Sequence, residues 1–331
     1  MKKVLGLGNA LVDILISLNN DNLLKEFSLP KGSMQLVNNE VASQIFEKAK
    51  LIKSGTRGIN SGGSAANTIN GLAQLGVGTG YIGAIGKDEY GSYFSKDMED
   101  KGTELFLNFR STETGRATTL ITPDSERTFA TYLGAAIELE AAMLKPESFK
   151  GYHYLHIEGY LAPNKPLFLR AMKLAKQNGV KVSIDMASYN IVEENLSFLK
   201  ESTEKYVDIV FANEEEAKAL TGKDPERALN ELASLCEIAV VKIGEKGSLV
   251  RCGTSTHRIG VLDVKSMDTT GAGDLYAAGF LYGLVQNYPL ETCGEIGSIL
   301  SGLVIESIGA RMSSEKWSIA KEKINKIGNT Y

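Results

Sequence analysis

Asp268-Thr269-Thr270-Gly271-Ala272-Gly273-Asp274 follows a predicted strand and opens a predicted apolar helix over 275–285. Small residues let the backbone approach a ligand closely, and a helix N-terminus offers free N–H groups and partial positive charge. The main-chain amides of Gly271, Ala272, Gly273 and Asp274 are therefore predicted to form an anion hole for a phosphate. Asp274, in the first turn, is placed to deprotonate an attacking hydroxyl. The alternative is a plain helix cap.

Strands alternate with helices along most of the chain. Strands are predicted over 4–7, 81–85, 154–157, 181–185 and 207–211, and helices over 64–75, 90–100, 166–177, 214–220 and 290–307. The first of these helices carries its apolar residues at helical spacing, with Ser64 as its predicted N-cap. Repeated strand–helix units predict an α/β fold, in which helices cover both faces of a mostly parallel sheet.

Two stretches, about 14–37 and 105–133, break this alternation. They are rich in Thr, Ser and short strand patterns without a good helix between them, so they are predicted to form a small β lid. No linker-like tract divides the chain, and we expect one domain over 1–331. The last helix, over 313–326 with Trp317, is read as a solvent-facing tail.

Composition narrows the classes of partner. Lys+Arg 36 against Asp+Glu 40 gives a net charge of −4, which disfavours nucleic acid, and the absence of a long apolar run disfavours a membrane span. The three cysteines, Cys236, Cys252 and Cys293, form no C-x-x-C pair, so we expect neither disulfides nor a zinc site and infer a reducing cytoplasm. A small-molecule ligand and a monomer or homodimer are the expectation.

A second glycine motif, Gly62-Gly63-Ser64-Ala65-Ala66-Asn67, also precedes a helix. Its glycines permit contact between backbone and a sugar-like ligand, and Asn67 can donate to and accept from vicinal hydroxyls; a simple loop is the alternative. Near the N-terminus, Leu11 replaces the third glycine of a dinucleotide fingerprint, so that interpretation fails. Asn9 and Asp13 are instead predicted to lie at a strand end, where a carboxylate can accept from two sugar hydroxyls.

With both glycine motifs in place, the chain resembles the PfkB or ribokinase-like family of ATP-dependent kinases, and within it the adenosine kinase branch. The two family signatures match 62–76 and 268–274, and shorter matches extend over essentially the whole chain, at 8–13, 30–34, 126–128, 158–160, 213–216 and 309–311. The resemblance implies a ribokinase-like three-layer sandwich with a mostly parallel central sheet and a small β lid.

The resemblance also assigns roles to residues. Asp274 becomes the general base, the amides of Gly271, Ala272 and Gly273 hold the transferring phosphate, and Arg127 folds over the phosphates from the lid. Acceptor contacts are assigned to Asn9, Leu11, Asp13, Gly62, Gly63, Asn67, Glu158 and Tyr160. Nucleotide contacts are assigned to Asn213, Glu216, Lys242, Gly244, Gly247 and Thr270. Asn213 and Glu216 would organise Mg²⁺ through water, and Asp268 marks a region that binds a monovalent cation such as K⁺ in relatives. From the residues alone, an acidic helix start is the preferred interpretation of 213–216, and 244–247 could equally be only a hairpin turn. Arg127 could equally be a solvated arginine beside Glu126.

The implied activity is transfer of the ATP γ-phosphoryl group to a primary hydroxyl of a nucleoside, adenosine giving AMP. Residues 9–13 resemble the adenosine kinase start, with Leu11 against the base, and Tyr160 could stack on a purine. A sugar kinase for ribose or fructose is the alternative, because Glu158 matches a carboxylate that touches ribose in sugar-kinase relatives. A catalytically silent nucleotide-binding regulator is the second alternative, disfavoured because Asp274, Gly271 and Gly273 are intact.

Overall fold

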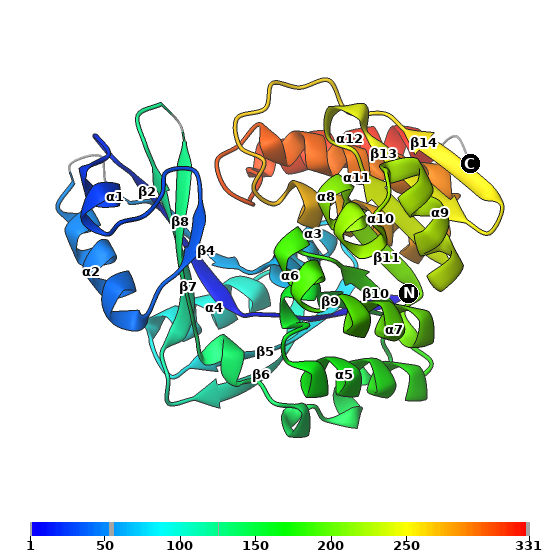
Figure 1. Ribbon diagram of the computed structural model, residues 1–331, viewed down its shortest axis with the longest axis horizontal. Helices are drawn as coiled ribbons and strands as arrows, with labels where there is room; N and C mark the ends of the chain where they lie inside the picture. The colour runs from blue at the N-terminus through cyan, green and yellow to red at the C-terminus, as the bar shows by residue number, and fades with distance from the viewer. Residues whose placement is uncertain (1, 53–55, 125, 329–331) are drawn as a thin grey trace.

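The structure is a computed structural model that describes residues 2–52, 56–124 and 126–328. Its described strands form two separate sheets (Figure 1). In spatial order the main sheet comprises β14 (Ser255–Ile259), β13 (Ser248–Cys252), β12 (Ile238–Lys242), β11 (Ile209–Asn213), β10 (Lys181–Asp185), β9 (Tyr154–Glu158), β1 (Lys3–Leu7), β5 (Gly78–Gly86) and β6 (Thr103–Arg110).

The main sheet is parallel from β12 to β6, and only β13 and β14 run antiparallel to their neighbours in the described part of the chain. Successive side chains of a strand point to opposite faces, so Val4 and Leu5 of β1 enter different hydrophobic cores. Both faces are therefore apolar and must be covered. The predicted α/β fold class with a mostly parallel sheet is confirmed.

Helices cover both faces. One core joins α3 (Ser64–Gln74), α4 (Glu89–Glu99), α10 (Ala272–Val285), α11 (Leu290–Ile305) and α12 (Ser314–Gly328) to the sheet. The other core joins α5 (Lys165–Gln177), α6 (Tyr189–Glu194), α7 (Leu196–Tyr206), α8 (Glu214–Thr221) and α9 (Pro225–Leu235). The interpretation of the last helix as a solvent-facing tail is wrong for Trp317, which is 7% exposed and packs in the first core. None of the described helices has the length and hydropathy needed to cross a membrane.

The second, smaller sheet is the lid. Its order is β3 (Met34–Leu36), β8 (Arg127–Gly134), β7 (Thr114–Ile121), β2 (Leu11–Ser17) and β4 (Thr56–Gly62). Figure 1 shows α1 (Asn22–Glu26) and α2 (Asn39–Lys50) on the side of this sheet away from the main sheet. Short 3₁₀ helices connect other elements: η1 (Ala135–Glu138), η2 (Ala141–Met143), η3 (Pro146–Phe149), η4 (Gly159–Leu161) and η5 (Gly244–Lys246).

The lid differs from the sequence expectation in two strands, whereas the predicted stretch 14–37 does contribute β2 and β3 to it. Residues 103–110 form β6, which pairs with β5 at the edge of the main sheet rather than joining the lid. The lid instead takes β4, which pairs antiparallel with β2. Its sequence, TRGINSG, lacks the apolar alternation that identifies a strand, and for that reason it was missed.

Candidate active site

Helices α3 and α10 begin side by side. A Cβ on Gly71 of α3 would lie 2.8 Å from the Cβ of Ala278 and 3.0 Å from Cδ1 of Leu275, both on α10. The absence of a side chain at this position therefore lets the two helices lie in contact. The close packing brings the two glycine motifs, which are about 200 residues apart in the chain, to one place.

Asp274 is held by two side chains of α3. The Ser64 hydroxyl donates to Oδ1 at 2.7 Å, and Nδ2 of Asn67 donates to Oδ2 at 3.0 Å. The predicted N-cap role of Ser64 is wrong: Gly63 is the cap, with φ of 98°, and the serine hydroxyl faces Asp274 instead. Burial raises the pKa of Asp274 to about 6, although these two hydrogen bonds favour the ionised form. A carboxylate of this kind can accept a proton near neutral pH.

The main-chain amides of 271–274 are mostly available to bind a ligand. Those of Gly271, Gly273 and Asp274 make no hydrogen bond to any residue the structure describes, as an anion hole requires. The amide of Ala272 differs from the expectation, because it donates to the carbonyl of Thr269 at 3.1 Å. In this conformation three of the four predicted amides can contact an anion, and Thr270 lies half-buried beside them.

Four neighbouring parallel strands end in polar residues at this point. Glu158, Asp185, Asn213 and Lys242 are the last residues of β9, β10, β11 and β12. They are paired in register, Glu158 with Asp185 and Asn213 with Lys242. Ligands of open α/β sheets bind outside the carboxyl ends of the strands, and the predicted site residues meet at that edge.

Lys242 supplies a cation beside the amides. A Cβ on Gly273 would lie 2.9 Å from Nζ of Lys242, so the ammonium group lies next to the start of α10. Nζ is 2.8 Å from Oδ2 of Asp185. Burial opposes the charge on Lys242, but Asp185 and Glu216 outweigh it and raise its pKa. Burial likewise opposes ionisation of Asp185, yet Lys242 holds the pKa of that carboxyl below its usual value. Sequence reasoning missed Asp185.

Asn213 and Glu216 form a helix cap. Glu216 N–H donates to Oδ1 of Asn213 at 2.9 Å, and the Asn213 N–H and Nδ2 donate to the two Glu216 oxygens at 2.8 and 2.6 Å. The acidic helix start predicted from the residues at 213–216 is confirmed, and the structure adds that Asn213 and Glu216 form a capping box there. Burial, with Asp185 nearby, raises the pKa of Glu216 to about 7. The described residues contain no group of three or more His, Cys, Asp or Glu that could hold a metal ion.

Asp13, predicted to contact the acceptor, lies against the second glycine motif. A Cβ on Gly62 would overlap the Asp13 carboxyl group, so the backbone of β4 packs directly against it. Burial raises the pKa of Asp13 to about 6, with Arg311 opposing and Asp274 reinforcing the shift. Arg311 donates to the carbonyl of Ser61 and, at 2.6 Å, to its hydroxyl. Arg311 was missed as a site residue; the match at 309–311 was the available signal.

Glu158, predicted as an acceptor contact, holds protein groups in this structure. It is 1% exposed, and its Oε1 accepts from N–H and Nδ2 of Asn9 at 2.9 and 2.6 Å. Its Oε2 accepts from the amide of Ala65 at 3.0 Å. Both carboxyl oxygens thus hold protein groups, and Glu158 fixes Asn9 and the start of α3. Burial raises its pKa to about 7.

The remaining predicted contacts are residues assigned to the acceptor, Gly63, Leu11 and Tyr160, and residues assigned to the nucleotide, Gly244 and Gly247. A Cβ on Gly63 would overlap the carbonyl of Asn9, so the two glycine-containing segments touch through their backbones. Leu11 is buried, whereas Tyr160 is 38% exposed with its hydroxyl 3.4 Å from the carbonyl of Ala187. Gly244 begins η5, in the turn between β12 and β13. The Gly247 N–H donates to the carbonyl of Gly244 at 3.0 Å.

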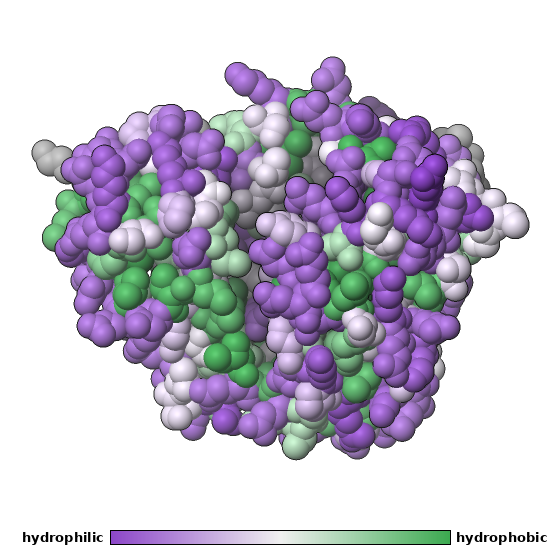
Figure 2. All heavy atoms as spheres, in the orientation of Figure 1, coloured by the Kyte–Doolittle hydropathy of each residue, from purple (hydrophilic) through white to green (hydrophobic). Residues whose placement is uncertain are grey.

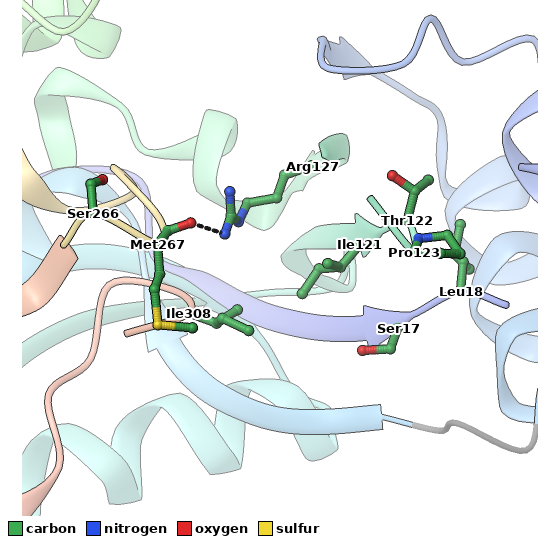
Figure 3. A pocket seen from close by; sticks show the side chains of 9 residues that line it. All are labelled: Ser17, Leu18, Ile121, Thr122, Pro123, Arg127, Ser266, Met267 and Ile308. Carbon is green, nitrogen blue, oxygen red and sulfur yellow. Dashed lines mark hydrogen bonds between the residues drawn. The ribbon is translucent and has the colours of Figure 1, made fainter. Parts of the chain in front are cut away.

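Arg127 contacts the loop before α10 in this conformation. Nε is 3.0 Å from Oδ2 of Asp268. The guanidinium also donates to the carbonyl of Met267, which ties the lid to the loop before α10 (Figure 3). Asp268 accepts from the amides of Thr270 and Gly309 at 2.9 and 2.7 Å. Its oxygens thus brace the backbone, and main-chain carbonyls would have to supply most ligands of a monovalent cation.

A cavity lies between the lid and this loop. It has a volume of about 350 Å³ and is lined by Ser17, Leu18, Ile121, Thr122, Pro123, Arg127, Ser266, Met267 and Ile308. Figure 2 shows the surface hollowed between the lid and the rest of the molecule. Neither Asp274 nor Lys242 lines this cavity, so it adjoins the base, the cation and the amides only through the loop before α10. A base, a buried cation and free amides together suit transfer of a phosphoryl group to a hydroxyl.

The chain matches known proteins over most of its length. A model of the "pfkB family carbohydrate kinase" matches residues 32–317. The crystal structure of adenosine kinase from Sinorhizobium meliloti is 34% identical, with 97% of this chain and 99% of that chain covered and a TM-score of 0.87. A probable sugar kinase from Rhizobium etli is 33% identical, with coverage of 97% and 98% and a TM-score of 0.87. The 5-dehydro-2-deoxygluconokinase of Geobacillus kaustophilus is 27% identical over 74% of this chain and 79% of that protein.

Proposed function

The chain belongs to the pfkB family of carbohydrate kinases, and from that premise we propose that it transfers the γ-phosphoryl group of ATP to a primary hydroxyl of a sugar. The observation that carries this proposal is the environment of Asp274. Its carboxylate lies at the start of α10 beside free amides and Lys242, with a pKa raised to about 6.

In the proposed reaction, Asp274 accepts the proton of the attacking hydroxyl, and the oxygen attacks the γ-phosphorus in line with the leaving ADP. The amides of Gly271, Gly273 and Asp274 hold the transferring group, and Lys242 offsets its charge. The donor set fits phosphate, because a side chain at Gly273 would fill the space next to the Lys242 ammonium. Asn213 and Glu216 would hold the waters of a magnesium ion, which when bound screens the charge of the phosphates.

A sugar acceptor is favoured for two reasons. Similar proteins include a probable sugar kinase and a 5-dehydro-2-deoxygluconokinase. On the acceptor side, Asp13 makes no hydrogen bond to any described residue, so its oxygens can accept from hydroxyls. This order reverses the preference reached from the sequence, where adenosine came first.

A nucleoside is the second candidate. It is supported by the 34% identity to the adenosine kinase of Sinorhizobium meliloti and by Tyr160, whose ring is 38% exposed and could stack on a base. A catalytically silent regulator is disfavoured, because nucleotide binding alone does not need the buried Asp274 carboxylate, which two donors hold beside free amides.

The test is ADP release with ATP, Mg²⁺ and a panel of ribose, fructose and adenosine. We expect release to depend on a sugar, and Asp274→Asn to lower kcat by about 10²–10⁴ while ATP still binds. Adenosine as the best acceptor would promote the second candidate. Turnover of Asp274→Asn close to that of the unaltered protein would remove Asp274 from its role.

A further inference from the structure

Arg311 joins three parts of the molecule. It lies in the segment between α11 and α12, and its Nη2 donates to the main-chain oxygen and, at 2.6 Å, to the hydroxyl of Ser61 on the lid strand β4. The same nitrogen is 3.7 Å from Oδ2 of Asp97 on α4, and the Arg311 side chain is 17% exposed. A cation is therefore fixed where the lid meets the rest of the fold.

The Asp97 carboxylate is shared between two cations. Lys101 forms an ion pair with Oδ1, and the N–H of Ser61, at 3.2 Å, and its hydroxyl both donate to Oδ2. Burial opposes ionisation of Asp97, but these donors and Arg311 hold its pKa below the usual value. Two positive charges thus face one negative charge. Nε of Arg311 is also buried without a hydrogen-bond partner among the described residues.

The Asp13 carboxyl group lies next to this cluster. Ser61 is followed on β4 by Gly62, where a Cβ would lie 2.2 Å from Cγ of Asp13. The Asp13 carboxyl group accepts no hydrogen bond from the residues that the structure describes. Burial raises its pKa to about 6; Arg311 opposes this shift, and Asp274 reinforces it. The positive charge not neutralised by Asp97 therefore favours the ionised form of Asp13.

The other titratable groups around Arg311 are few. Burial lowers the pKa of Arg311, and Asp97 and Tyr93 on α4, Asp13 on β2 and Asp274 on α10 act against this shift. A guanidinium stays charged throughout the physiological pH range. Of these groups, Asp13 and Asp274 have a pKa raised to about 6, so they are the ones that titrate just below neutral pH.

We propose that Arg311 is a positioning residue whose charge keeps the Asp13 carboxylate ionised, and so able to accept hydrogen bonds from hydroxyl groups of the acceptor. An ionised carboxylate accepts at both oxygens, whereas a protonated one must donate from one of them. Arg311 acts through Asp13 and needs no contact of its own with the acceptor. The inference rests on the proposed function, because it takes Asp13 to contact the acceptor.

Arg311→Gln removes the charge and keeps a donor for Ser61. ADP release is measured from pH 5 to pH 9 with the best acceptor among ribose, fructose and adenosine. An arginine beside a carboxylate lowers the pKa of that group by about one to three pH units, so we expect the acid limb of kcat/KM for the acceptor to move upward by about one pH unit. Since the pKa of Asp13 is about 6, kcat/KM should fall about threefold at pH 6.5 and little at pH 8.5.

Three further variants separate charge from packing. Arg311→Lys keeps the charge and should leave the limb in place. Asp97→Asn removes the carboxylate that competes for Arg311 and should move the limb downward, a result that does not depend on the folding of Arg311→Gln. Arg258→Gln, the same chemical change at an exposed ion pair with Glu226, should leave the limb in place.

A background of Asp13→Asn assigns the shift to Asp13 rather than to Asp274. In this background Arg311→Gln should no longer move the limb that remains. Urea melts at pH 8 measure the same coupling without catalysis. Asp13→Asn should raise the urea midpoint more in the Arg311→Gln background than in the parent protein, because the pKa of Asp13 then lies further above its value in the unfolded chain.

The outcomes separate the two claims. The inference is overturned, while the kinase assignment stands, if Arg311→Gln lowers kcat/KM equally at every pH, if its shift of the limb persists in the Asp13→Asn background, or if Asp13→Asn raises the urea midpoint equally in both backgrounds. No ADP release by the unaltered protein with any acceptor overturns the proposed function. The urea melts then still decide whether Arg311 holds the charge of Asp13.

Discussion

Removing the Ser64 hydroxyl should change how the catalytic rate depends on pH. Ser64 donates to Oδ1 of Asp274 at 2.7 Å, and a hydrogen bond to a charged group contributes about 1.5–3 kcal/mol. At about 1.36 kcal/mol per pH unit, Ser64→Ala should move the acid limb of the kcat profile upward by about one to two pH units. Since the pKa of Asp274 is about 6, the variant should lose about threefold or more at pH 6.5 and little at pH 8.5.

The assay is ADP release with saturating acceptor from pH 5 to pH 9. Ser64→Thr keeps the hydroxyl and should restore the limb. Thr68→Val is the matched control, because Thr68 donates to the main-chain oxygen of Asp274 at 3.1 Å and leaves both donors to the carboxylate in place. A uniform loss of kcat in Ser64→Ala, with the limb unmoved, would show that Ser64 acts only through packing and would refute the reasoning.

Three further outcomes are expected. Asp13→Asn should raise the free energy of unfolding at pH 8 by about 1–3 kcal/mol in urea melts, because the pKa of Asp13 is about 6 in the folded protein and 3.8 in the reference state. This gain in stability should fade as the pH falls through 6 and vanish below about 4. Equal stabilities of the variant and the parent protein at pH 8 would contradict the prediction. Lys242→Met leaves Asp185 buried without its partner and should lower the free energy of unfolding by about 3–5 kcal/mol. The double variant with Asp185→Asn should recover much of this stability but not the turnover. A single variant as stable as the parent protein would count against the ion pair. Gly273→Ala places a methyl group 2.9 Å from Nζ of Lys242 and should leave the melting temperature nearly unchanged while kcat falls by about 10² or more, so normal turnover would argue against an anion at these amides.

The main sheet could be predicted because its signals are local. Each strand–helix unit carries its own periodicity, as the helix at 64–75 does, and the alternation dictates a parallel sheet with two covered faces. The lid could not be delimited in this way. Strand β6 has the same residue types as lid strands, and its partner β5 decides to which sheet it belongs.

The candidate site likewise combines features that can be predicted from local sequence with features that depend on distant packing. The residue types of both glycine motifs and their positions at helix starts were readable from the chain. The partners of Asp274 were not, because Ser64 could satisfy a local cap or a distant carboxylate, and the packing of α3 against α10 selects the second. Asp185 and Arg311 carry no local motif; their significance arises from neighbours on other strands, Lys242 for the first and Ser61 for the second.

The hydrogen bond between Ser64 and Asp274 joins positions separated by 210 residues. At a synthesis rate of roughly 5–20 residues per second, a growing chain displays its first glycine motif for about ten seconds or longer before the second has been made. During that interval the nascent polypeptide has neither its base nor its anion hole. Under the proposed function, turnover therefore requires synthesis at least through Asp274, and shorter nascent chains would phosphorylate no acceptor.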